Sequence, residues 1–246
     1  MATDPTSAII SGLQASVALD GLPISISPGM CYVPGPARIL TDGTTSVVLS
    51  SPLPNTFYHL YGYDAGGGIM GLEASATPPS DPYLGTARTK QGDPTRRYLI
   101  SGRTNPSGVL RPGKHIWPAA MGNRIMLDAA SAAGSIPLTL LSALTAVTPQ
   151  TIDLSAVLPI TATRATVQLQ NPTNFWLFTS RSERGAPSAT NYQYAAVPGS
   201  SPVVDVTLDA DRKFTVLLTA TGLLGPILGL LTGSVTITLV GYDFDR

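Results

Sequence analysis

Short runs of alternating apolar and polar residues recur through the second half of the sequence. They cover residues 165–170, 204–208 and 235–239. In the last run Val235, Ile237 and Leu239 alternate with threonines. Because side chains of a β-strand point alternately to opposite faces, each run predicts a half-buried strand of an antiparallel sheet. We therefore expect an all-β protein built of antiparallel β-sandwich or jelly-roll-like modules.

The first half shows the same organisation. The whole chain has 24 glycines and 22 prolines, which leave little room for long helices. Turn signals such as Ala65–Gly68 separate the apolar runs, whereas residues 76–82 are proline-rich and predict an extended strap. The predicted strands are Ala15–Leu19, Ile24–Ile26, Met30–Val33, Ser46–Leu49, Phe57–Tyr63, Ile69–Ala74 and Arg97–Ser101.

These patterns suggest two β-modules in tandem. We expect an N-terminal module with an extended basic loop at residues 1–118, an apolar connector at 119–160 and an antiparallel sandwich at 161–246. Within the connector, Ile136–Leu144 is compatible with a short helix or a pair of strands, and its periodicity does not decide between them.

The chain is poor in charge, with 12% Asp, Glu, Lys and Arg and a net charge of zero. So few charges leave much apolar surface, which predicts burial against other subunits, with Ile136–Leu144 and Leu223–Leu231 as candidate contacts. Zero net charge disfavours nucleic-acid binding. The second segment is too short to cross a membrane and contains Pro226, so we expect no membrane insertion.

No residue pattern of a known catalytic, cofactor or metal site occurs in the sequence. The two histidines are far apart in the sequence. His59 lies in an aromatic strand and is expected to be a hydrogen-bonded core residue, whereas His115 is expected at the surface or in an interface. The closest carboxylates, Asp209 with Asp211 and Asp243 with Asp245, are expected in a solvated turn and at a solvated chain end. The single cysteine, Cys31, predicts a buried strand thiol. We expect a protein that is not an enzyme.

Eight of the fifteen Lys and Arg residues fall between Arg88 and Arg124. This cluster is compatible with a solvated loop, a surface for acidic glycans, or a docking surface in which guanidinium groups pair with acceptors of a neighbouring protein. The candidate docking residues are Arg88, Lys90, Arg96, Arg97 and Arg103.

Aromatic residues provide a second candidate site, since sugar faces stack on exposed rings. The candidates for glycan stacking are Trp117, Trp176, Tyr192 and Tyr194, which are equally compatible with a hydrophobic core.

The segment from Phe57 to Leu99 resembles a recurrent module of bacteriophage fibre and appendage proteins. The resemblance is carried by the aromatic Phe57–Tyr63, by Leu72–Ser75, by Gly85–Asp93 and by Thr95–Leu99, and Gly241–Arg246 is similar to the chain ends of the same group. Pro94 departs from the pattern, and a long repetitive shaft is absent from the sequence.

The resemblance implies β-sandwich modules that often form trimers on a capsid, neck or tail. We therefore expect a structural component of a phage virion, made in the host cytoplasm, which forms a homotrimeric short fibre or spike on the head, neck or tail and contacts other virion proteins. The alternatives are a capsid decoration protein or a host-glycan-binding module, and a polysaccharide depolymerase is a more distant one.

Overall fold

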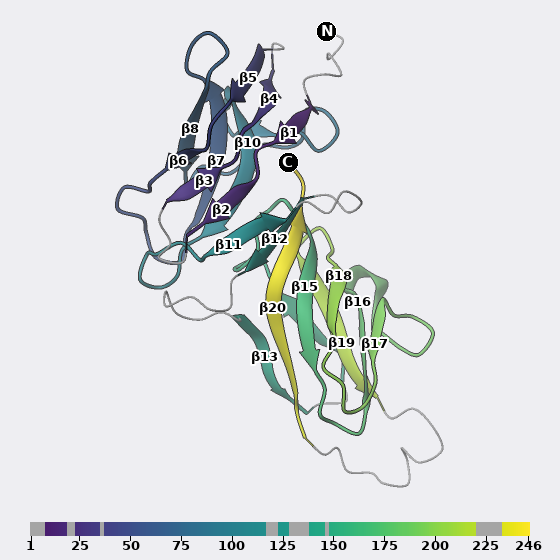
Figure 1. Cartoon of the computed structure of the whole chain (residues 1–246). Helices are drawn as coiled ribbons and strands as arrows, with labels where there is room; N and C mark the ends of the chain where they lie inside the picture. Colours follow the sequence, from purple (N-terminus) through teal and green to yellow (C-terminus); the bar gives the residue numbers. More distant parts are fainter. Residues whose placement is uncertain are drawn as a thin grey trace. The chain divides into compact units, whose positions relative to one another are not determined.

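A computed structural model describes residues 8–18, 23–34, 37–116, 123–127, 138–145, 148–219 and 233–246. The chain divides into two compact units. Unit 1 comprises Met1–Gly134 together with Asp245–Arg246, and unit 2 comprises Ser135–Phe244. The described residues are organised in antiparallel sheets and contain no α-helix, which confirms the predicted all-β class (Figure 1). None of them belongs to a helix that is long and apolar enough to span a membrane.

Unit 1 contains three groups of hydrogen-bonded strands. The first group is ordered β1 (Ile10–Gly12), β4 (Gly29–Val33), β5 (Ala37–Thr41). The second is ordered β8 (Met70–Ser75), β7 (Phe57–Asp64), β10 (Asp93–Arg103), β9 (Thr89–Lys90). The third is ordered β12 (Asn123–Leu127), β11 (Gly113–Ile116), β2 (Ala15–Val17), β3 (Ile24–Ile26), β6 (Thr45–Val47).

Apolar side chains from all three groups are buried in unit 1. Fully buried members include Ile26 from β3, Cys31 from β4 and Tyr98 from β10. The prediction of a buried thiol is thus confirmed. The Gly-rich turn after β7 is also confirmed, because the Asp64 carboxylate accepts bonds from the backbone N–H groups of Gly66 and Gly68.

Unit 2 is an eight-stranded jelly roll. One sheet has the order β13 (Leu138–Leu144), β20 (Val235–Phe244), β15 (Ala162–Gln170), β18 (Val203–Thr207). The other has the order β14 (Gln150–Asp153), β19 (Lys213–Thr219), β16 (Trp176–Arg181), β17 (Tyr194–Ala196). Every consecutive pair of strands except β16 and β17 changes sheet, which is the double Greek-key connectivity of a jelly roll.

The core of unit 2 lies between these two sheets. Its apolar residues come from the alternating runs of the sequence, and the predicted inward positions of all three runs are buried. From the opposite sheet Leu177, Phe214 and Leu218 are each 0% exposed. The period-two pattern therefore identified the buried face of this sheet correctly.

Several expectations differ from the structure. The segment expected as a connector, 119–160, includes β12, β13 and β14, and the segment expected as an extended basic loop before residue 118 includes β9 and β11 beside the predicted strand of β10. Of the segment Ile136–Leu144, the described part Leu138–Leu144 is neither a helix nor a strand pair but a single strand bonded to β20. Leu223–Leu231 lies outside the described residues.

Two expectations of solvent exposure are wrong. His115 is 2% exposed because β11 pairs with both β2 and β12, which places its side chain inside unit 1. Asp243 is 4% exposed because β20 continues to Phe244 instead of ending before the carboxylate. By contrast, Asp209 does lie in a turn, where its backbone oxygen accepts a bond from Arg212 N–H.

Candidate functional site

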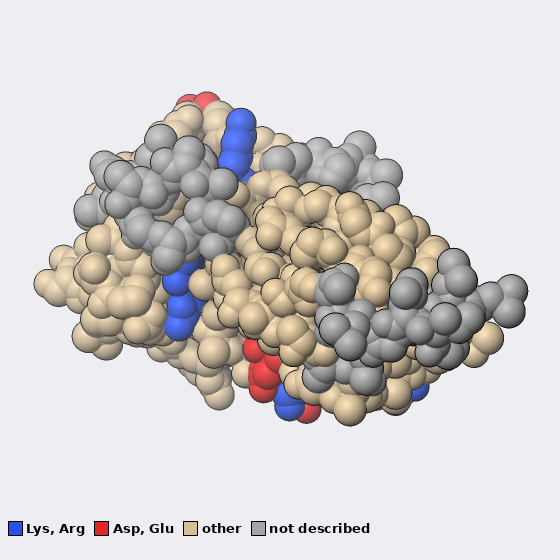
Figure 2. Space-filling view, turned by 90° about the horizontal axis from the view of Figure 1, so that it is seen from below, with Lys and Arg blue, Asp and Glu red and all other residues tan. Residues whose placement is uncertain are grey.

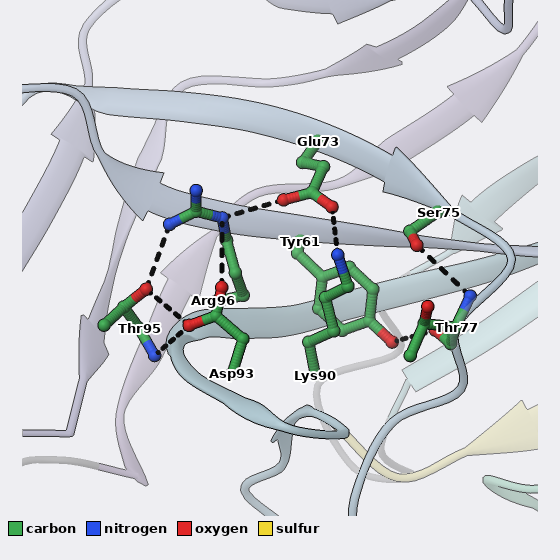
Figure 3. Close-up of polar contacts among 8 residues, drawn as sticks. All are labelled: Tyr61, Glu73, Ser75, Thr77, Lys90, Asp93, Thr95 and Arg96. Carbon is green, nitrogen blue, oxygen red and sulfur yellow. Dashed lines mark hydrogen bonds and ion pairs between the residues drawn. The ribbon is translucent and has the colours of Figure 1, made fainter.

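The middle of the basic cluster is neutralised within its own sheet (Figure 3). Glu73 on β8 forms ion pairs with Lys90 on β9 and with Arg96 on β10, the latter at 2.7 Å between Oε2 and Nε. Arg96 also lies 3.9 Å from the carboxylate of Asp93. Its guanidinium carbon is 4.2 Å from the centroid of the Tyr63 ring.

These contacts stabilise the charged form of the carboxylates. Partial burial raises the pKa of Glu73, but hydrogen bonds from Lys90 and Arg96 outweigh that effect, so its pKa lies below the usual value. A hydrogen bond from the Thr95 hydroxyl is the main cause of the lowered pKa of Asp93. Lys90 and Arg96 therefore already have anionic partners in unit 1, and their positive charge is largely compensated there.

Two other candidate arginines donate hydrogen bonds to backbone carbonyls of unit 1. The Arg88 guanidinium donates to the carbonyl of Ser80 at 3.0 Å. Arg97 is 0% exposed and donates to the carbonyls of Arg88 and Ala8 at 2.9 and 3.3 Å. Burial lowers the pKa of Arg97.

Residue Arg246 binds backbone in the same unit. Its guanidinium donates to the carbonyls of Leu13 and Gly12 at 2.9 and 3.2 Å, and its own carbonyl accepts from the Thr86 hydroxyl. Burial and the nearby Arg97 charge lower the pKa of Arg246 to about 10. Arg97 and Arg246 together hold the backbone at Ala8 and at the β1–β2 junction, so they act as structural residues of unit 1.

The last candidate of the docking set, Arg103, is at the end of β10, directly opposite Phe57 on β7. Its guanidinium carbon lies 5.8 Å from the Phe57 ring centroid. Desolvation lowers the pKa of Arg103, and desolvation together with the Arg103 charge lowers the pKa of Arg111. The structure thus separates the five predicted docking residues into a neutralised pair, two arginines that donate to backbone carbonyls, and Arg103.

A histidine and a serine meet in the interior of unit 1. His59 Nδ1 is 2.7 Å from Ser101 Oγ, which is 2.8 Å from the Tyr98 hydroxyl. His59 is 4% exposed and Ser101 3%. Desolvation lowers the pKa of His59 to about 4, so the ring is neutral at pH 7. The prediction of a hydrogen-bonded core histidine is confirmed, and sequence spacing had not indicated Ser101 as its partner.

The aromatic candidates are only partly brought together. In unit 2 the Trp176 ring is stacked on the Phe178 ring, with centroids 6.2 Å apart and planes 16° apart. The centroid of the Tyr192 ring lies 5.4 Å from that of Phe178. Tyr194 is paired with Thr179 and therefore points to the opposite face of the sheet. Trp117 lies outside the described residues.

The three rings, which we call the aromatic strip, lie on the sheet face directed away from the jelly-roll core, because their neighbour Leu177 points inward. Tyr192 is 49% exposed. Within the described residues neither the Trp176 indole N–H nor the Tyr192 hydroxyl has a hydrogen-bond partner. The sequence indicated two of these residues, and Phe178 completes the strip.

In the described part of the chain, no group of three or more His, Cys, Asp and Glu side chains could hold a metal ion. A scan against known protein families finds no matching family, and a search of curated proteins finds no relative.

Proposed function

We propose that this protein is a non-enzymatic structural component of a bacteriophage virion, a short fibre or spike on the head, neck or tail. The observation that carries the proposal is the strand order of unit 2, since the eight-stranded jelly roll is a fold that viral structural proteins use repeatedly.

The distribution of charge supports a role in an assembly. Figure 2 shows a face on which most described residues are uncharged, with only a few Lys, Arg, Asp and Glu side chains. Exposed apolar residues include Val203 and Ile160 of unit 2, which are 56% and 57% exposed. A surface of this composition favours contacts with other subunits over a solitary soluble state.

Strand β13 provides a candidate subunit contact. Leu138, Leu140 and Leu141 are only half-buried although they belong to the sheet. Among the described residues β13 is hydrogen-bonded to β20 alone, which leaves its second edge open. We propose that this edge packs in a homotrimer. Light scattering coupled to size exclusion should give three chain masses, and a stable monomer at high concentration would refute the trimer.

The virion proposal is tested by mass spectrometry of particles purified from a culture in which the chain is expressed from its own genome. Peptides of the chain should co-purify with capsid proteins through a density gradient. If the peptides occur in the lysate but are missing from the particle fraction, the proposal is wrong. A capsid decoration protein, the alternative location, would be released at lower denaturant concentration than a fibre embedded in a neck or tail.

The aromatic strip favours a second candidate function, recognition of a host glycan. Phe178 is 4% exposed, so the rings that offer apolar surface to a sugar face are those of Trp176 and Tyr192, whose N–H and hydroxyl can bond to sugar hydroxyls. Binding on a glycan array should be lost in Trp176→Ala and Tyr192→Ala, whereas Tyr194→Phe, on the other face of the sheet, should bind normally. Equal binding by all four proteins would exclude the strip as the binding site.

A further inference from the structure

Two loops beside the end of β10 form a rigid rim of unit 1. The Thr104 hydroxyl donates to the Leu53 carbonyl at 2.6 Å and accepts from Thr56 N–H at 2.8 Å. Asn55 N–H donates to the Asn105 carbonyl, and the Asn105 side chain accepts from Ser107 and Val109 N–H groups. Both loops are therefore held in one conformation by their own hydrogen bonds, and we call residues 53–56 together with 103–111 the β10 rim.

Arg103 stands out among the arginines of this rim and of the rest of the described chain. Its Nε is buried and has no hydrogen-bond partner. The other described arginines with an orphan Nε have another contact, such as Arg88 with the Ser80 carbonyl or Arg212 with the Leu158 carbonyl. For Arg103 the contacts are the Phe57 ring and the like charge of Arg111.

The environment of the Arg103 guanidinium is unfavourable in the protein without a partner. A half-buried guanidinium loses hydration, a neighbouring guanidinium repels it, and a ring face compensates only in part. The backbone fixes the closeness of the two residues, because Arg111 N–H donates to the Arg103 carbonyl at 2.9 Å. A carboxylate placed at the Arg103 fork would supply the missing acceptor and offset the repulsion from Arg111.

We propose that the β10 rim docks an acidic segment of a partner protein, with Arg103 as the residue that binds its carboxylate. A protein segment is favoured over an acidic polysaccharide because Leu53, 62% exposed, is fixed to Thr104 of the same rim. Arginine and aromatic residues are enriched in protein interfaces, and the exposed Leu53 adds apolar surface on a segment bonded to the residue that follows Arg103. The inference does not depend on the phage assignment, since it concerns only the chemistry that the rim recognises.

Calorimetry measures the binding of a hexaglutamate peptide to the full chain. A hyaluronate oligosaccharide, which carries its carboxylates on a sugar, is measured for comparison. The variants are Arg103→Met, Arg103→Lys and, as a matched control for net charge, Arg38→Met, which removes an exposed arginine of β5. We expect the peptide Kd to rise about tenfold or more in Arg103→Met, less in Arg103→Lys, and to stay unchanged in Arg38→Met.

Thermal stability provides an independent readout. Because no described residue offers Arg103 a hydrogen-bond acceptor, Arg103→Met should leave the melting temperature of unit 1 unchanged or raise it by about 2–4 °C. A clear decrease would show that Arg103 is needed for folding and would overturn the proposal. Absence of peptide binding to the unaltered chain, tighter binding of hyaluronate than of the peptide, or equal peptide affinities in the Arg103→Met and Arg38→Met variants would each overturn it as well.

Discussion

Acidification from pH 7 to pH 5 should destabilise unit 1 and leave the jelly roll largely unaffected. The only two histidines of the chain, His59 and His115, are both in unit 1 and both buried. Burial lowers the pKa of each to about 4. In the unfolded chain their pKa returns to about 6.5. Between these values the unfolded state binds more protons than the folded state, so stability falls as the pH falls.

The size of the effect follows from the two pKa values. Each histidine contributes stability that is fully present above pH 6.5 and is lost progressively as the pH approaches 4. Between pH 7 and pH 5 the loss is about 2 kcal/mol for each histidine, or about 4 kcal/mol for unit 1. Asp245 acts in the opposite direction, because burial raises its pKa and the folded state then binds a proton more strongly. Glu73 and Asp93, whose pKa values lie below their usual ones, act in the same direction as the histidines and oppose the effect of Asp245.

Native-state hydrogen exchange with mass spectrometry can follow both units in one sample, since each peptide reports the opening free energy of its own region. Peptides of β7 and β10 should lose protection at pH 5 after correction for the intrinsic exchange rate, whereas peptides of β15 and β19 should not. His59→Gln keeps a polar side chain beside Ser101 but does not titrate, so this variant should lose about half of the pH dependence, whatever its stability at pH 7.

Two results would refute this reasoning. One is an equal loss of protection in both units between pH 7 and pH 5. The other is an unchanged pH dependence in a double variant in which both histidines are replaced by glutamine, which would assign the effect to carboxylates.

Three further predictions test the core and the charge network. Phe214→Ala should destabilise unit 2 by about 3–5 kcal/mol in urea unfolding, whereas Val203→Ala, at an exposed position, should change stability by less than about 0.5 kcal/mol. Cys31, whose pKa burial raises to about 12, should react with a thiol reagent at pH 8 only after unfolding in urea, and reaction of the native protein at the rate of a free thiol would contradict its burial. Glu73→Gln should cost about 1 kcal/mol at pH 7, because it removes two partly exposed ion pairs, and this difference from the parent protein should vanish as acid protonates Glu73.

The strands of unit 2 could be predicted where their two faces differ in polarity. Val204 and Val206 alternate with Asp205 and Thr207, and the first pair is buried while Asp205 is exposed. Strand β13 could not be identified in this way, because leucines occupy both of its faces and only Leu144 is buried. Without β13 and β14 the eight-stranded order could not be derived, since jelly-roll connectivity depends on strand pairs far apart in the sequence.

The basic cluster could be located from the sequence, but the environment of each residue could not. Arg96 and Arg97 are adjacent in β10, yet Arg96 meets Glu73 at the sheet surface and Arg97 is 0% exposed. Strand alternation predicts that two neighbours point to opposite faces, but it does not predict which face will accept a charge. That depends on whether buried backbone carbonyls are available as acceptors, which only the tertiary structure reveals.

Arg97 and Arg103 differ in the acceptors that the protein itself offers them. Arg97 is fully buried and has two carbonyl acceptors, so its removal would leave unsatisfied groups in the core. Arg103 is only half-buried and has none within the described chain. A charge with internal acceptors contributes to the fold of the isolated protein, whereas a half-buried charge without them depends on water or on a partner for its acceptors. For this reason Arg103 is the residue of the basic cluster whose replacement should separate binding from stability.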